Sequence, residues 1–199
     1  MSWPAQIVLE GKFVRLEPLS IAHSVDLATA AADGSLSALW YTAVPTPGKI
    51  GAEIERRLGL QDKGSMLPFA VVKAGKAVGM TTYMNIDAAI KRVEIGSTWY
   101  GKSVQRTPLN TECKLMLLTH AFEKLECVAV EFRTHFMNFQ SREAIAKLGA
   151  KQDGILRNHT RTANGELRDT VVFSIIASEW PTVKAHLQYR LERLGGLAK

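Results

Sequence analysis

The order of the elements between residues 93 and 149 limits what this chain can fold into more than any other feature. A strand-like run, VEIGSTWY, is followed by a basic loop over residues 101–108 and by a helix that we expect to start at Asn110. A second strand-like run, VAVEFRTH, leads into a helix predicted over residues 138–148. The basic loop thus opens onto a helix N-terminus. Such an end carries free N–H groups and a partial positive charge, which suit a phosphate.

The flanking sequence predicts a mixed sheet around this segment. Alternating and periodic apolar residues predict strands over 12–18, 69–73 and 77–83 and helices over 20–32 and 50–60, and later a long hairpin over 150–176. An amphipathic helix over 179–195, with Ser178 as its cap, ends the pattern. Strands, then β-α-β-α, then a hairpin predict an α/β (α+β) fold. We expect a mostly antiparallel sheet of about seven strands, with helices on both faces, in a single domain over residues 1–199.

Composition narrows the classes of partner. The formal net charge is +6, but basic residues alternate with acidic ones, which favours a solvated surface over a nucleic-acid stripe. No apolar run approaches the ~20 residues of a membrane span, and the N-terminus lacks a secretion signal. Cys113 and Cys127 give neither a disulfide framework nor metal-ligand spacing. We therefore expect a cytoplasmic protein without nucleic-acid, membrane or metal partners.

Two motifs in this segment carry a family resemblance. Residues 105–110, QRTPLN, are similar to the Q/R-x-x-G-x-G/A loop of the GNAT acyltransferases. Asn138 and Ser141, followed by KLGA at residues 147–150, are similar to that family's Asn-x-x-Ser…Lys-Leu-Gly helix. The resemblance runs from about residue 11 to residue 180 and favours the branch of ribosomal-protein N-terminal acetyltransferases. It implies a monomeric or homodimeric N-acetyltransferase that uses acetyl-CoA and acts on an amine of a small molecule or peptide.

The resemblance also implies a role for the basic loop. It would bind the diphosphate of the coenzyme, whereas the residues alone are equally consistent with a plain strand-to-helix connection capped by Asn110. The predicted coenzyme-binding residues are Gln105, Arg106, Thr107, Leu109, Asn110 and Thr111. Pro108 stands where the family has its first glycine, and it has no N–H to donate. Either one donor is lost, or the proline pre-orders the loop at the helix entry.

The second motif combines a helix cap with a candidate proton donor. Asn138 is expected to cap its helix, and by resemblance its side chain binds the pantetheine arm. The resemblance implies that Ser141 protonates the leaving thiolate, since the position of the usual tyrosine is Ile145. Pro108 and Ile145 together leave a rival prediction open, a CoA-binding module with impaired catalysis.

Glu94 is the candidate general base. It is either a structural carboxylate or the group that deprotonates the incoming ammonium, which must lose a proton before it can attack a thioester. Strand alternation would place Glu94, Gly96 and Thr98 on one face, where the glycine lets a ligand approach the backbone. His120 and His135 are predicted to be structural, with a base role as the alternative.

Other residues suggest an acceptor site. Trp40 and Tyr41 either line an acceptor pocket or belong to the core. A basic cluster near the late hairpin either is a solvated edge that prevents aggregation or helps to select an acidic acceptor. Its members are Arg157, His159, Arg161 and Arg168.

Overall fold

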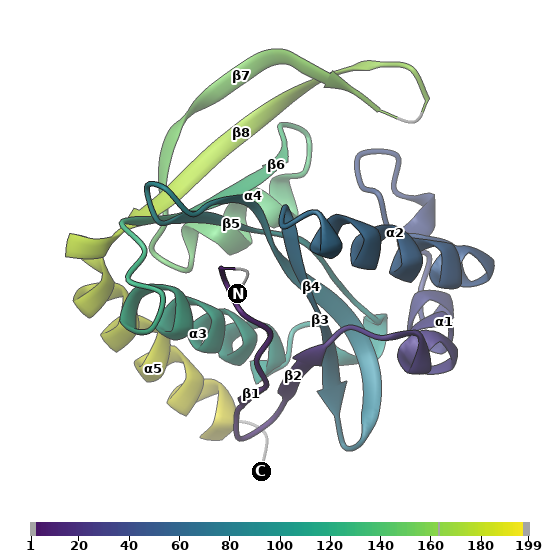
Figure 1. Cartoon of the computed structure of the whole chain (residues 1–199), viewed down its shortest axis with the longest axis horizontal. Helices are drawn as coiled ribbons and strands as arrows, with labels where there is room; N and C mark the ends of the chain where they lie inside the picture. The colour runs from purple at the N-terminus through teal and green to yellow at the C-terminus, as the bar shows by residue number, and fades with distance from the viewer. Residues whose placement is uncertain (1–2, 163, 197–199) are drawn as a thin grey trace.

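A computed structural model describes residues 3–162 and 164–196, and its centre is one continuous sheet (Figure 1). The strands lie in the order β1-β2-β3-β4-β5-β6-β8-β7, and every neighbouring pair is antiparallel except β5 and β6. The predicted mixed, mostly antiparallel sheet is confirmed, with eight strands because of the short β1. The strands are β1 (Leu9–Glu10), β2 (Arg15–Pro18), β3 (Met66–Lys73), β4 (Lys76–Asp87), β5 (Arg92–Tyr100), β6 (Ala129–His135), β7 (Lys151–Arg161) and β8 (Leu167–Ile176).

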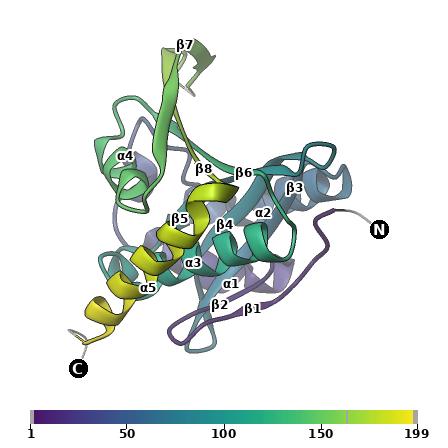
Figure 2. The same cartoon turned by 90° about the vertical axis from the view of Figure 1, so that its left-hand side faces the viewer.

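Helices cover both faces of this sheet. They are α1 (Ser24–Ala32), α2 (Ile50–Asp62), α3 (Pro108–Glu123), α4 (Phe139–Ala146) and α5 (Trp180–Gly196). Buried side chains of α3, α4 and α5, such as Leu117, Ile145 and Leu187, share one apolar cluster with Val93 and Ile95 of β5. Those of α1 and α2 form a second cluster on the other face (Figures 1 and 2). We call these the α3 face and the α1 face. No helix of the described chain is long and apolar enough to cross a membrane.

The end of the chain forms a long hairpin and a closing helix. β6 pairs along its whole length with residues 170–176 of β8, whereas β7 pairs with β8 alone and extends away from the body (Figures 1 and 2). Gly149, at φ +98°, ends α4, and a Cβ there would lie 3.1 Å from Val183 of α5. Glycine therefore allows both the left-handed turn and the close packing of α5.

Besides the helix predicted over 20–32, whose first turn (residues 21–23) is 3₁₀ and precedes α1, two helix starts differ from the sequence prediction. α3 begins at Pro108 with Thr107 as its N-cap, not at Asn110, since threonine at the cap and proline at the first helical position suit this geometry. α5 begins at Trp180, and Ser178 lies inside the preceding 3₁₀ turn, Ala177–Glu179, instead of capping the helix. These corrections move each start by one or two residues and keep the predicted order of elements.

A bulge in β5 overturns the predicted alternation of its side chains. Ser97 has φ 48°, and the pairing with β4 shifts between Met80 and Thr82. Glu94 and Gly96 precede the bulge and face the α1 side. Thr98 follows it and points to α3, where its hydroxyl accepts a hydrogen bond from Lys114 at 3.0 Å. The extra residue of a bulge reverses every later side chain of a strand.

Candidate active site

The two parallel strands β5 and β6 separate at the centre of the sheet. They pair only over Arg92–Glu94 and Ala129–Glu131, although β5 continues to Tyr100 and β6 to His135. The remaining half of β5 pairs with β4 on its other side only. Its free edge has backbone groups that an extended ligand can use, as a further strand would.

Glu94 lies at the point where the two strands separate. Its side chain is 5 % exposed, and Oε2 accepts a hydrogen bond from Asn85 Nδ2 at 2.6 Å. Oε1 lies above Gly96, within 2.8 Å of where a Cβ would be, so a side chain there would displace the carboxylate. Burial raises the pKa of Glu94, while the Asn85 hydrogen bond and the charge of Arg133 lower it in part. A raised pKa brings a carboxylate closer to the value that a general base needs near neutral pH.

Asn85 is a residue that the sequence prediction missed. It lies at φ 47° in an irregular part of β4, where the register with β5 shifts. Asparagine is one of the few residues that accept this left-handed conformation. The irregularity directs its amide toward Glu94, so Asn85 orients the candidate base.

The basic loop leads into α3 through a tight turn. Arg106 has φ 59°, Thr107 caps the helix, and Gln105 donates from Nε2 to the Tyr100 carbonyl at 2.9 Å. In the described part of the chain, the backbone N–H groups of Arg106 and Thr107 have no hydrogen-bond acceptor.

The first helical turn of α3 adds further donors. Leu109 N–H makes only a long, 3.4 Å contact with the Thr107 hydroxyl. Asn110 is the third helical residue, where the N–H has no partner inside a helix, whereas a helix uses the N–H of its fourth residue, Thr111, internally. The donors offered to an anion are thus centred on residues 106–110.

Asp33, at the C-terminal end of α1, holds this loop from a distance of about seventy residues in sequence. Its backbone carbonyl accepts from Lys102 N–H at 2.9 Å, and its Oδ2 accepts from Ser103 N–H at 2.7 Å. Hydrogen bonds from the side chain and the backbone N–H of Ser103 lower the pKa of the Asp33 carboxyl. No local pattern identifies this contact, because Asp33 reads in sequence only as part of a helix-ending DGS run.

The structure places Asn138 and Ser141 at the start of α4. Asn138 caps the helix as predicted, since its Oδ1 accepts from Ser141 N–H at 3.0 Å. Ser141 is half-buried, and no hydrogen bond of its hydroxyl is found in the described chain. Ile145 is buried in the α3-face cluster. No hydrogen bond joins Ser141 to Glu94 in that part of the chain, and α4 packs on the face opposite to the Glu94 side chain.

Trp40 and Tyr41 lie against His135 on the α1 face. The indole ring is 5.1 Å from the imidazole ring, centroid to centroid and nearly perpendicular, and the phenol ring is 6.5 Å away. Trp40 is 54 % exposed and so is not a core residue. His120, by contrast, lies near Tyr83 between α3 and the sheet.

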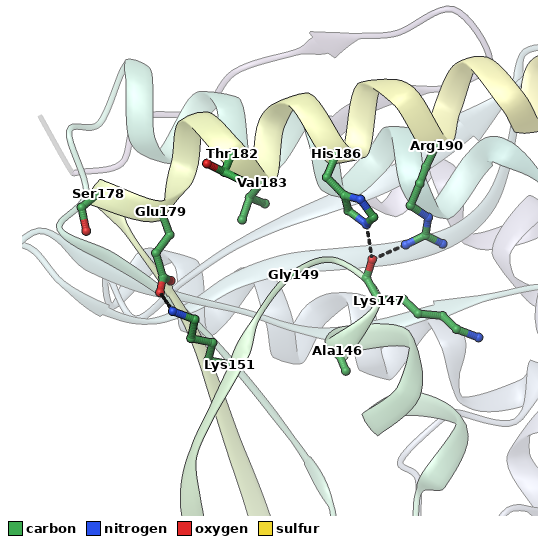
Figure 3. A pocket seen from close by; sticks show the side chains of 10 residues that line it. All are labelled: Ala146, Lys147, Gly149, Lys151, Ser178, Glu179, Thr182, Val183, His186 and Arg190. Carbon is green, nitrogen blue, oxygen red and sulfur yellow. Dashed lines mark hydrogen bonds and ion pairs between the residues drawn. The ribbon is translucent and has the colours of Figure 1, made fainter.

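A cavity of about 850 Å³ lies elsewhere, between the end of α4, the start of β7, and α5 (Figure 3). His186 and Arg190 extend from α5 to the Lys147 carbonyl, and Lys151 pairs with Glu179 at 2.5 Å. It contains none of the predicted site residues. Within the described ranges, no three His, Cys, Asp or Glu side chains gather as a metal site requires.

The candidate site thus combines a separated strand pair, a basic loop at a helix N-terminus and a buried carboxylate. Residues 14–151 match the family model described as "Acetyltransferase (GNAT) domain". The chain therefore belongs to the GNAT acetyltransferase family and is by class an acetyl-CoA-dependent N-acetyltransferase.

Particular relatives are consistent with this membership. The Bacillus subtilis protein named "Putative ribosomal N-acetyltransferase YdaF" is 30 % identical over 106 residues, which cover 53 % of this chain and 57 % of that relative. The chain thus matches little more than half the length of this curated relative. A GCN5-related N-acetyltransferase structure from Brucella melitensis is 31 % identical, with a TM-score of 0.85, and the match covers 94 % of this chain and 86 % of that one.

A third relative supports the fold alone. The structure of Mycobacterium smegmatis RimJ in complex with CoA-disulfide is 23 % identical, with a TM-score of 0.76 and a match covering 96 % of each chain. The predicted likeness to the ribosomal-protein acetyltransferase branch is supported by the match to YdaF.

Proposed function

We propose that this enzyme transfers the acetyl group of acetyl-CoA to a primary amine by direct attack, without an acetylated enzyme intermediate. The observation that carries the proposal is the position of Glu94, a buried carboxylate at the point where the free edge of β5 begins. Burial raises its pKa, as a base for an ammonium ion requires. Cys113 and Cys127 are buried, and burial raises the pKa of each thiol, to about 12 and about 11 respectively. A thiol of that kind is a poor nucleophile.

In the proposed step, the two substrates meet from opposite faces of the sheet. The ammonium approaches on the α1 face and gives a proton to Glu94, directly or through a water molecule. The neutral nitrogen then attacks the thioester carbonyl carbon, the C–S bond breaks, and the nitrogen keeps the acetyl group and loses its second proton, which replaces the proton delivered to the thiolate. Ser141, on α4 across the sheet, donates a hydrogen bond or proton to the departing thiolate. Positioning and hydrogen bonds to the developing charge supply most of the catalysis.

The coenzyme would bind along the free edge of β5 and over the start of α3. The proposed diphosphate site comprises Arg106 and Thr107, with free backbone N–H groups, and the donors at Leu109 and Asn110. Gln105 shapes the loop through its bond to Tyr100, and Thr111 completes the first turn. Asn138 would orient the pantetheine arm from the start of α4.

The same proposal covers the organisation and setting of the chain. We treat it as one acetyltransferase domain, because β1 to β8 form a continuous sheet. A cytoplasmic location rests on the two cysteines, which are free and buried. The likeness to YdaF favours a peptide α-amine as acceptor, and Trp40 and Tyr41 would line its pocket.

The test is thiol release from acetyl-CoA with a panel of peptides, amino acids and polyamines. We expect turnover with at least one amine, and Glu94→Gln should lower kcat by roughly a hundred-fold or more. An isosteric amide keeps the shape of the site and removes only the proton acceptor. The rival reading, a CoA-binding module without chemistry, predicts acetyl-CoA binding by calorimetry but no thiol release with any amine. That result would refute the proposed function.

A further inference from the structure

The basic cluster of the late hairpin separates into paired and unpaired arginines. Arg157 pairs with Asp169 at 2.5 Å, and Arg161 donates to the Gly165 carbonyl at 2.8 Å. Arg168 is different, since its Nε is buried without a partner, and its guanidinium has no hydrogen bond or ion pair within residues 3–162 and 164–196. Burial lowers the pKa of Arg168, and the nearby charge of Glu94 raises it in part. A buried Nε–H without a partner, on a guanidinium near the candidate base, needs an explanation.

Strand register places Arg168 on the same face as Glu94. His135 of β6 pairs with Thr170 of β8, and Arg168 follows two residues further along the same row of β8 side chains. It therefore continues the line of β6 side chains on the α1 face, beyond the point at which β6 ends. The acceptor would approach Glu94 across this row.

His135 contributes a second unpartnered donor in the same row. It is 5 % exposed, and its Nδ1 accepts from Met137 N–H at 3.0 Å. The proton of the neutral ring must then be on Nε2, so His135 donates and does not serve as a base in this geometry. Nε2 is buried, and no acceptor for it is found in the described part of the chain.

The surrounding charges balance without Arg168. Glu131 binds Arg92 at 2.7 Å and also binds Arg133, which lies 3.7 Å from Glu94. Two carboxylates thus face two guanidinium groups. Asp169, the other acidic residue near His135, forms an ion pair with Arg157. Among these groups of β5, β6 and the late hairpin, Arg168 is left without an acidic partner.

We propose that Arg168 and His135 form an anchor for a carboxylate carried by the acceptor, so that the preferred acceptors are acidic amines. This inference rests on the proposed function and specifies its substrate class. A guanidinium and a neutral N–H can share the two oxygens of one carboxylate, and charge-assisted bonds of this kind are the strong ones. The acceptor amine would then extend from the anchor toward Glu94.

Trp40 covers this anchor in the present structure. Its ring makes an edge contact with His135, and every hydrogen bond found for residues 35–45 is made inside that segment. The indole can therefore move without breaking a bond to the sheet. An acceptor carboxylate would take its place over Nε2, and the aromatic ring would then form a wall of the occupied site.

The experiment compares matched acids and amides as acceptors. Thiol release is measured with tetrapeptides that begin with Asp or Asn and with Glu or Gln, and with free glycine and glycinamide. Wild-type enzyme should prefer the acidic member of at least one pair. Arg168→Gln should lower kcat/KM for that acid by about ten- to a hundred-fold and leave its amide nearly unchanged. Arg168→Lys should recover part of the loss. His135→Phe should reduce the preference, while His135→Gln, which keeps an N–H donor, should retain more of it.

The matched control is Arg161→Gln, an exposed arginine of the same hairpin, which should keep the wild-type acid-to-amide ratio. An equal ratio in wild type and Arg168→Gln would overturn the anchor, as would a wild-type enzyme that prefers every amide. If acetyl-CoA binds but no amine reacts, N-acetylaspartate and N-acetylasparagine are titrated into the CoA-bound protein. Equal affinity for the two would also overturn the anchor. Absence of acetyl-CoA binding would remove the proposed function and the anchor with it.

Discussion

A buried lysine in α3 gives the sharpest stability prediction. Lys114 is 7 % exposed and lies between α3 and the sheet, where its ammonium donates to one acceptor, the Thr98 hydroxyl, at 3.0 Å. Burial lowers its pKa from 10.5 to about 8. We expect Lys114→Met, which keeps the chain length and removes the charge, to stabilise the protein at pH 7. The gain should shrink as the pH rises.

The magnitude follows from the two pKa values. A fall from 10.5 to about 8 means that the folded state disfavours the charged form by about 3 kcal/mol. Below pH 8 both states are protonated, so the full cost is present. Between pH 8 and 10.5 the unfolded chain binds more protons, so this contribution to stability rises with pH. Losing the bond to Thr98 costs about 1 kcal/mol, which leaves a net gain of about 2 kcal/mol at pH 7.

The assay is urea unfolding of both proteins at pH 7, 8.5 and 10, followed by circular dichroism. Cys113 and Cys127 also contribute in this range, because burial raises the pKa of each thiol in the folded state, to about 12 and about 11. The contribution of Cys127 is common to both proteins and cancels in the difference, whereas Cys113 interacts with Lys114 and is replaced by alanine in both proteins for this comparison. Lys124→Met, at an exposed lysine beyond the same helix, is the control and should change stability by less than about 0.5 kcal/mol at every pH. Equal stability of Lys114→Met and wild type at pH 7, or a difference that does not vary with pH, would refute the argument.

Three further substitutions test the contact between Glu112 and the N-terminal hairpin, the proposed proton donor Ser141, and the proline at the start of α3. The Glu112 carboxylate accepts hydrogen bonds from three backbone N–H groups, those of residues 12–14, at 2.7, 2.7 and 2.9 Å. Glu112→Gln should therefore lower the free energy of unfolding by about 3 kcal/mol. Glu55→Gln, at an exposed position, is the control, and an equal effect of the two substitutions would contradict the role of Glu112. Ser141→Ala should lower kcat roughly ten- to a thousand-fold with little change in acetyl-CoA affinity, and an unchanged kcat would exclude Ser141 as donor. Pro108→Gly should weaken acetyl-CoA binding several-fold in calorimetry, because proline at the first helical position pre-orders the loop; tighter binding would instead indicate a lost donor.

Local patterns were sufficient to predict the scaffold of the site. The Asn138 cap, the strand that carries Glu94 and the loop before α3 all depend on residues within one or two turns of one another. Such short-range preferences are what propensity and periodicity record. The family resemblance then assigned candidate roles to these positions, and the structure gives each of them a location.

Contacts between distant segments explain what the sequence could not predict. Asp33 holds the loop at Ser103 across seventy residues, and Asn85 reaches Glu94 from an irregular stretch of β4. The bulge at Ser97 moved Thr98 to the α3 face, and no residue pattern in VEIGSTWY marks it. A bulge depends on how two strands pair, so it is decided by the partner strand as much as by its own sequence.

The late hairpin shows how pairing assigns different roles to similar residues. Arg157, Arg161 and Arg168 are equivalent in a sequence reading, and both a solvated edge and an acceptor contact were open to all three. Strand pairing distinguishes these arginines. β8 pairs with β6, which places Arg168 in the same row of side chains as His135. β7 pairs with β8 only, so Arg157 lies at the edge of the sheet, where it pairs with Asp169. A solvated edge and the proposed substrate contact can then coexist in one hairpin. Strand order therefore determines which of the three arginines lies on the same face as Glu94. The ratio of kcat/KM for acidic and amide acceptors, compared between wild type and the Arg168 variants, tests whether this arginine contacts the acceptor.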